Sequence, residues 1–310
     1  MQPVCARFAN SSHPNFMLVQ QLVRRWLLFL LVLFSLFLLP PQALTQEGSQ
    51  DHPVADTTLP ARCDCPSQAE QGSGTLSFAW GYNKSWFSRS SIHFSDHTAD
   101  DYDFTLYNLE AHDRPGLEIV GTNLSNLSVP QYVYRLAYFF NDPNDLGVEI
   151  CFDHVKYVMT QNQTARIEGE IRGRKVSTDT VVSSQFLRFE HTNGANFWMV
   201  NFLKRQNLVK SSNRLHWLGL LGKVGVGVVI PKSDVAIFDV ETDNRYHIAG
   251  YVLGIDVGLR YDFLKYGFVE ASLKGAYADY SDVLTVGEGR ASHSFFTLEA
   301  IMSLGFQVNL

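Results

Sequence analysis

Apolar and polar residues alternate with a period of two along most of the chain from Thr75 to Leu310. This spacing is the signature of β-strands, because successive side chains of a strand point to opposite faces. The last segment is the clearest case: one face is apolar and the other is polar, with Ile301 as the exception. The apolar face consists of Phe296, Leu298, Ala300, Met302, Leu304, Phe306, Val308 and Leu310. We therefore expect a long final strand with one apolar face.

A second long alternation runs from His247 to Phe263. Tyr251 and Leu253 belong to its apolar face, whereas the opposite face consists mostly of charged residues and glycines, with Val252 as an exception. The segment has about 17 residues, while the strands of soluble sandwiches usually have five or six. Strands of this length, with one lipid-compatible face and one polar face, predict a membrane barrel with a polar lumen.

Ten segments show the alternating pattern. They are 75–86, 102–111, 130–140, 146–159, 182–191, 196–205, 214–230, 246–263, 267–280 and 292–310. A closed ring is expected, because an open sheet edge cannot be satisfied in hydrocarbon. The predicted fold is all-β, an antiparallel transmembrane β-barrel of about ten strands, with eight to twelve possible. The connection from 160 to 181 is long where this count places a short turn, so we expect a missed or split strand there.

Two segments precede the predicted barrel at 75–310. Arg24 and Arg25 stand before an apolar run that is too short to span a bilayer comfortably, and Ala43 follows it. Residues 1–43 are therefore predicted to be a cleaved secretory signal peptide, with an uncleaved membrane anchor as the alternative. Residues 44–74 are polar, contain Pro and Gly, and lack an apolar period, which predicts a flexible, disordered linker.

Charge and cysteine content narrow the function classes. The formal net charge is −6, and an acidic chain has no general attraction to nucleic acid. Cys63 and Cys65 are separated by one residue, which suits neither an easy disulfide nor a usual metal-ligand pair, so their redox state stays open. The sequence contains no nucleotide loop, zinc motif or nucleophile elbow, and we expect no cofactor and no metal.

Several short stretches resemble an uncharacterised family of bacterial outer-membrane β-barrel proteins. They are Phe152–Met159 (FDHVKYVM), Phe189–Gly194 (FEHTNG), and His247–Tyr251 (HIAGY) leading to Gly258–Arg260 (GLR). The resemblance implies the barrel fold and supplies no catalytic residues. A barrel of this kind is expected in the outer membrane of a Gram-negative bacterium, in contact with outer-membrane lipid and lipopolysaccharide. The final strand resembles the terminal strand that the barrel-assembly machinery recognises, although its last residue is Leu310 instead of Phe or Trp.

Some small outer-membrane barrels are enzymes that cut or transfer acyl chains on lipid A or phospholipid. Such chemistry needs a hydroxyl activated by an imidazole. Ser292, His293 and Ser294 are the nearest match, but neighbouring residues of a strand face opposite sides, so His154 or His191 could instead supply the imidazole. The alternative that we favour is that these are ordinary polar residues at the edge of a loop.

Charged residues on the polar faces favour an ion-pair network in the lumen, because narrow barrels fill their interiors with side chains. The predicted members are Arg135, Glu149, Asp153, Arg188, Glu190, Arg260, Asp262, Glu270 and Lys274. The sequence thus predicts a small, largely plugged barrel with a structural, adhesive or narrow-transport role. An acyl-modifying enzyme and a soluble secreted ligand-binding barrel are the alternatives, and the oligomeric state is left open.

Overall fold

The computed structural model describes residues 74–98, 101–117, 130–143, 145–211, 216–243, 245–263 and 265–310. The predicted signal peptide at 1–43 and all but the last residue of the predicted linker lie outside these residues, as do Cys63 and Cys65. Among the described residues, no helix is long and apolar enough to cross a membrane.

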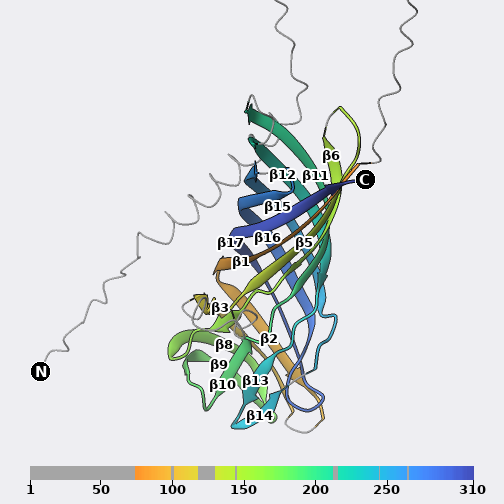
Figure 1. Cartoon of the computed structure of the whole chain (residues 1–310). Coiled ribbons are helices and arrows are strands. Elements are labelled where there is room, and N and C mark those ends of the chain that lie inside the picture. The colour runs from red at the N-terminus through yellow and green to blue at the C-terminus, as the bar shows by residue number, and fades with distance from the viewer. Residues whose placement is uncertain are drawn as a thin grey trace, which may run out of the picture. The chain divides into compact units, whose positions relative to one another are not determined.

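Eight antiparallel strands of the described residues close into a ring (Figure 1). They are β1 (Thr75–Phe87), β5 (Tyr132–Phe139), β6 (Leu146–Asp153), β11 (Phe197–Lys210), β12 (His216–Val229), β15 (Gly250–Phe263), β16 (Gly267–Leu284) and β17 (Arg290–Asn309). β1 closes the ring because it pairs with β5 on one side and with β17 on the other. The predicted antiparallel barrel is confirmed, with a strand number at the lower end of the predicted range.

The alternation of the sequence becomes the two surfaces of this ring. On β17, the outward-facing Met302 and Leu304 are 65% and 61% exposed, whereas the inward-facing Glu299 and Ser303 are 0% and 4% exposed. Ile301, the exception in the pattern, faces inward and is buried. An apolar exterior around a polar interior is the arrangement of transmembrane barrels, the reverse of a soluble protein.

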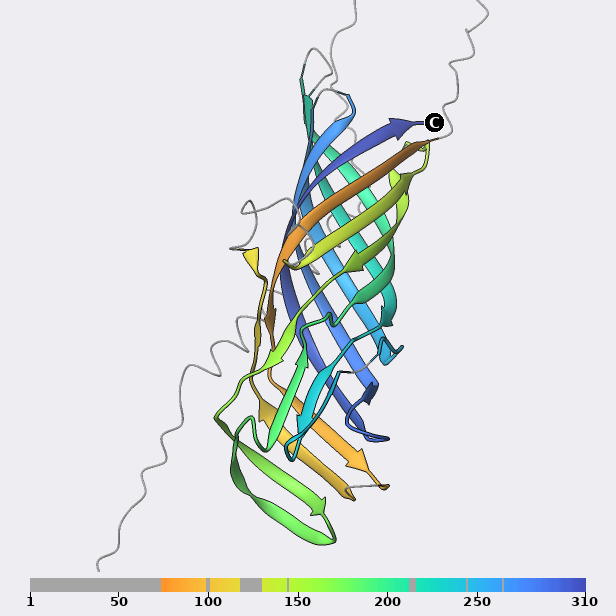
Figure 2. The ribbon, with the colours of Figure 1, turned by 60° about the horizontal axis from the view of Figure 1, so that its bottom comes forward.

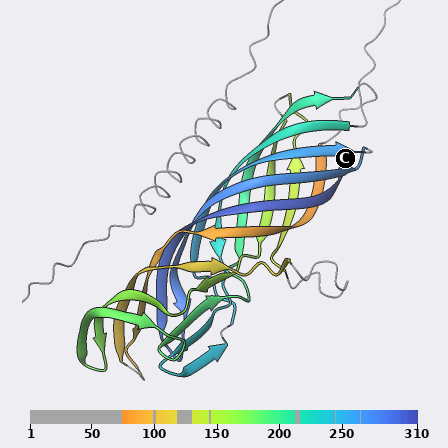
Figure 3. The ribbon, with the colours of Figure 1, turned by 90° about the vertical axis from the view of Figure 1, so that its left-hand side faces the viewer.

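The two ends of the ring differ in their connections. At one end β5 leads to β6 and β15 leads to β16 through short turns, and Thr75 lies opposite Asn309 at the same end. Figure 3 shows the C-terminus at this end, which we call the short-turn end. The short turn predicted between 263 and 267 is present here.

At the other end the barrel strands continue into a second structure, which we call the extension (Figure 2). Here β17 pairs with β2 (Ser90–Asp96), and the sheet continues through β3 (Tyr102–Leu109), β8 (Gln163–Ile171) and β9 (Arg174–Val182). A separate five-stranded sheet lies against it, in the order β14 (Val240–Asp243), β13 (Asp234–Ile237), β10 (Leu187–His191), β7 (Tyr157–Met159) and β4 (Ala111–Asp113). Phe94 of β2 and Phe189 of β10 meet edge to face in the apolar core between the sheets, with ring centroids 5.5 Å apart.

The extension explains where the predicted strands and the observed ring differ. Segments 102–111 and 182–191 do form strands, but these strands lie in the extension and not in the ring. The long connection at 160–181, where a missed strand was expected, contains β8 and most of β9. β9 is exposed along most of its length, so its alternation is weak. β8 alternates more clearly, but only Ala165 and Ile167 of its inner face are buried.

Candidate functional site

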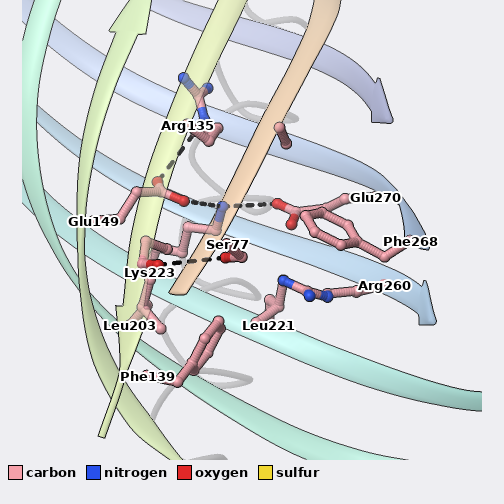
Figure 4. Close-up of a pocket in the computed structure, with 12 residues that line it drawn as sticks. Ser77, Arg135, Phe139, Glu149, Leu203, Leu221, Lys223, Arg260, Phe268 and Glu270 are labelled. Carbon is pink, nitrogen blue, oxygen red and sulfur yellow. Dashed lines mark hydrogen bonds and ion pairs between the residues drawn. The ribbon is translucent and has the colours of Figure 1, made fainter. Parts of the chain in front are cut away.

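The barrel lumen is filled by charged side chains, most of which lie beside a group of opposite charge. Lys223 of β12 stands at its centre, with its Nζ 3.0 Å from Oε2 of Glu149 and 2.7 Å from Oε1 of Glu270 (Figure 4). All three side chains are buried. The cavity that remains among them has a volume of about 10 Å³, roughly the space that one water molecule needs. The lumen at this level is therefore closed.

A second group of charges lies next to this centre, toward the extension. Asp153 of β6 accepts hydrogen bonds from both Arg135 and Lys274 and is fully buried. Lys274 Nζ also lies 3.9 Å from Oε1 of Glu299, whose Oε2 accepts a 2.7 Å hydrogen bond from Asn83. Each of the four charges in this group thus has an opposite charge beside it, which is the condition under which ions remain in a low-dielectric interior.

A third group lies toward the short-turn end. Arg260 donates to Oδ1 of Asp262 and, at 2.7 Å, to Oε1 of Gln307. Its guanidinium lies 3.4 Å from the ring centroid of Phe268, which adds a cation–π contact. Planar contacts of this kind suit arginine, whose delocalised charge is less strongly hydrated than an ammonium.

Most residues of the predicted lumen network meet inside the barrel. The structure brings together Arg135, Glu149, Asp153, Arg260, Asp262, Glu270 and Lys274. Arg188 and Glu190 instead lie on β10 in the extension. There Arg188 contacts Asp234 at 2.9 Å and also Glu241, and Arg114 lies 3.3 Å from Glu190. These two residues belong to a partly exposed surface cluster because their strand is not part of the ring.

Three central lumen residues were missing from the predicted network: Lys223, Asp256 and Glu299. The signal for them was present in the period-two pattern. Lys223 is the charged residue on the polar face of 214–230, and Glu299 is the charged residue on the polar face of the final strand. A polar position on a barrel strand is predicted to face the lumen whether or not its partner can be identified.

A histidine pair lies deeper in the extension, where β10 crosses β17. His191 and His293 bring their Nε2 atoms to 3.3 Å, and Nδ1 of His191 is 2.9 Å from Oγ of Ser233. The aromatic rings of Tyr157, Tyr280, Phe189 and Phe295 surround the pair. Burial among these rings lowers the pKa of His191 to about 3, so that its imidazole is neutral at physiological pH.

The candidate catalytic residues separate in the structure. Ser292 and Ser294 are half-buried on the outward face of β17, while His293 points inward, as the alternation predicted. His154 lies elsewhere, with Nδ1 2.9 Å from Oδ1 of Asn196 and its ring stacked on a tyrosine. Only His191 and His293 of the five candidates are brought into contact with each other.

The contacts of His191 resemble those of a catalytic triad: it would be the base, Ser233 would supply the hydroxyl, and His293 would orient the base. Ser233 and His191 are, however, only 2% and 0% exposed. A lipid or ester carbonyl would have to come within bonding distance of the serine oxygen, and core side chains occupy that space. The arrangement can fix the position of β10 on β17, but in this conformation it cannot receive a substrate.

No protein-family model matches the chain, and no curated protein matches it. Several solved structures are similar to the chain, including the three that follow. The outer membrane protein OprG from Pseudomonas aeruginosa is 10% identical, over 77% of this chain and 99% of that chain, with a TM-score of 0.37. Ail, the attachment invasion locus protein of Yersinia pestis, in complex with the heparin analogue sucrose octasulfate, is 11% identical over 76% and 99% of the two chains, with a TM-score of 0.28. Neisserial surface protein A is 9% identical over 74% and 97%, with a TM-score of 0.26.

These three solved structures are of bacterial outer-membrane β-barrel proteins. At these TM-scores no feature of the lumen, the extension or the histidine pair is transferred from them.

Proposed function

We propose that this chain is a non-conducting outer-membrane barrel that displays its extension at the cell surface, in a structural or adhesive role. The observation that carries the proposal is the closed lumen: buried ion pairs around Lys223 leave a cavity of only about 10 Å³. The second sheet of the extension adds a further packed layer beyond the lumen. A narrow-transport role is disfavoured for the same reason.

The exposed apolar band supports the membrane placement. Large apolar side chains on the outside of several ring strands are about half exposed, among them Ile150, Val200, Val226, Leu253 and Met302. A soluble secreted barrel would present this continuous apolar surface to water, which monomeric soluble proteins avoid. Outer-membrane lipid and lipopolysaccharide are the surroundings that this surface fits, and the apolar final strand fits recognition by the barrel-assembly machinery.

The connections suggest the orientation. Bacterial outer-membrane barrels have short turns on the periplasmic side and longer connections outside. The short-turn end would therefore face the periplasm, after export directed by the predicted signal peptide at 1–43, and the extension would face outward. An acyl-modifying enzyme is not favoured, because Ser233 and His191 are buried and the candidate serines of β17 point away from His293.

Conductance and labelling test the two parts of this proposal. Purified full-length chain in a planar lipid bilayer should give no ion channels, whereas a porin examined in parallel does. In intact cells, Gly173→Cys at the β8–β9 turn should react with a membrane-impermeant thiol reagent, while Tyr266→Cys at the short-turn end should react only after permeabilisation. Both variants need Cys63 and Cys65 replaced by serine, since Cys5 is removed with the predicted signal peptide, and Cys151 is already buried.

Regular single-channel conductance would contradict the closed lumen. Labelling of Tyr266→Cys but not Gly173→Cys in intact cells would contradict the orientation, and recovery of the chain in the soluble fraction would contradict the membrane placement.

A further inference from the structure

The extension ends in an open sheet edge. β9 is the last strand of the twelve-stranded sheet, and among the described residues it pairs with β8 alone. Its pairing with β8 runs without a bulge from Ile171 opposite Arg174 to Gln163 opposite Val182, and it contains no proline. Bulges, prolines, charged side chains and covering loops are the usual means by which proteins protect such an edge against strand pairing. β9 has no bulge and no proline, and no further strand of the described residues pairs with it, but it carries the charged residues Lys175 and Asp179. A strand that pairs with this edge must therefore offer complementary charges.

The β8–β9 turn determines which backbone groups of β9 point outward. Its two residues, Arg172 and Gly173, have φ of 51° and 73°, as a type I′ turn requires. In such a hairpin the flanking pair, Ile171 and Arg174, is hydrogen bonded. The N–H of Arg172 donates at 2.7 Å to the carbonyl of Asp101, on the other side of β8, which agrees with this alternation. Alternate residues of β9 therefore direct their N–H and C=O groups away from β8, beginning with Lys175.

The outward-directed residues are Lys175, Ser177, Asp179 and Val181. The carbonyl of Val181 already accepts a 3.0 Å hydrogen bond from the N–H of Ser183. The first three residues are exposed, whereas Val176 and Val182, on the opposite face of β9, turn toward the extension core. The free stretch of the edge is thus centred on Ser177 and carries a basic residue on one side and an acidic residue on the other.

We propose that β9 pairs antiparallel with β9 of a second copy of this chain, in the register that places Ser177 opposite Ser177 of the second copy. In an antiparallel pair the two members of each opposed position share a face, so this register puts Lys175 of each chain opposite Asp179 of the other. The two-fold symmetry creates this contact twice. This pairing would make the extension a site of self-association. It rests on the proposed function, because that proposal places the extension at the cell surface.

The neighbouring symmetric register is less suitable. If Thr178 were at the centre, Lys175 would lie opposite Val181, whose carbonyl is engaged, and Asp179 would lie opposite Ser177. Both charges would then lose their complementary partner on the second copy. Within one chain, Nη1 of Arg166 lies 4.0 Å from Oδ1 of Asp179. This exposed contact is compatible with a further basic partner, because a carboxylate accepts several donors.

Charge reversal tests the pairing. Purified full-length chain in detergent micelles should sediment as a dimer, and Lys175→Asp or Asp179→Lys should each weaken self-association about tenfold, because each places two like-charged pairs across the interface. The double variant K175D/D179K should recover the wild-type association. Arg245→Asp, an equal charge change at an exposed position outside the sheets, is the matched control and should not change it. Heat-modifiable migration on a gel reports that each variant is folded.

A wild-type chain that remains monomeric, or a double variant that associates as weakly as the single variants, would overturn the proposal. Neither result touches the closed lumen, which bilayer conductance measures separately. The register is tested by cysteine crosslinking in the background with Cys63 and Cys65 replaced by serine. Ser177→Cys should form a disulfide-linked dimer, because hydrogen-bonded opposed Cα atoms are about 5.5 Å apart. Thr178→Cys, with its counterparts offset along the strands, should crosslink far less, and the reverse order would overturn this register.

Discussion

The barrel and the extension share strands, yet the two faces of those strands have opposite chemistry in the two regions. On β17 the inward-facing Glu299 and Ser303 are polar within the barrel, while the inward-facing Phe295 is apolar in the part next to the extension. On the outward face, Met302 is apolar and Ser294 is polar. The strand keeps its direction and its alternation throughout. Its outer face is apolar where it fits lipid, outside the barrel, and polar where it fits water, outside the extension.

The level at which the inner face changes from polar to apolar, which we call the inversion, is the same on the neighbouring strand. On β16 the inward-facing residues change from Lys274 to Ala276, directly opposite the change from Glu299 to Thr297 and Phe295 on β17. On the outer face at this level the rings of Tyr277 and Phe296 meet, with centroids 5.1 Å apart. Aromatic residues gather at the two interfaces of membrane barrels. We therefore place the outer membrane boundary of the proposed barrel at these two rings.

Of the substitutions that test this difference between the barrel and the extension, we expect one in the lumen to lower the free energy of unfolding most. Lys223→Met keeps most of the side-chain volume but leaves Glu149 and Glu270 without the ammonium group between them. Removing one partner of a buried ion pair typically lowers the free energy of unfolding by about 3–5 kcal/mol. Urea unfolding of the chain reconstituted in lipid, followed by heat-modifiable migration, measures the change. Arg245→Met, at an exposed position outside the sheets, is the control, with an expected change within about 0.5 kcal/mol.

A loss below about 1 kcal/mol for Lys223→Met would contradict the dry, closed lumen. It would mean that water or protons reach the two carboxylates readily, and the barrel interior would then resemble the surface of the extension.

The contrast also explains how much of the structure could be predicted from the sequence. Long strands with an apolar outer face, such as 246–263 and 292–310, were recognised because lipid requires a continuous apolar surface. β8 was missed since a polar hairpin in water has no such requirement, and its turn, Arg172–Gly173, is only two residues long. The contact of His191 with His293 joins strands about a hundred residues apart, and no local pattern could indicate that pairing.

The second prediction places one arginine on either side of the inversion. Met302→Arg puts a charge in the middle of the outward apolar face of β17, which should lower the free energy of unfolding in lipid by about 2–4 kcal/mol. Ser294→Arg is on the same face of the same strand but on the extension side of the boundary marked by Tyr277 and Phe296. It should change the free energy of unfolding by no more than about 0.5 kcal/mol. Equal effects of the two variants in lipid would contradict the assigned membrane boundary.

The third prediction uses the histidine pair to loosen the extension alone. In the unfolded chain the pKa of a histidine is about 6.5, whereas burial lowers that of His191 to about 3. Between these values the unfolded state binds a proton that the folded state does not, so stability falls as the pH drops below about 6.5. The loss from His191 alone should be about 2 kcal/mol at pH 5, since each unit is worth about 1.4 kcal/mol, and His293, whose pKa burial also lowers, adds to it.

Protease cleavage of the extension in intact cells at pH 7 and pH 5 measures this loosening, and the barrel fragment should stay in the membrane at both values. His191→Gln removes the titrating imidazole and should reduce the difference between the two pH values. An unchanged pH dependence in that variant would assign the effect to another group.

The smallest effect is expected at the charges that the sequence grouped with the lumen but the structure places on the extension. Arg188 contacts Asp234 and Glu241 with 28% of its side chain exposed, whereas Lys223 is 1% exposed. Water solvates the carboxylates of the Arg188 cluster once the arginine is removed, so Arg188→Met should cost less than about 1 kcal/mol. The same unfolding measurement as for Lys223→Met gives the comparison directly. A loss as large as that of Lys223→Met would mean that the extension surface is covered in the native state, and the difference in charge burial between the two regions would no longer hold.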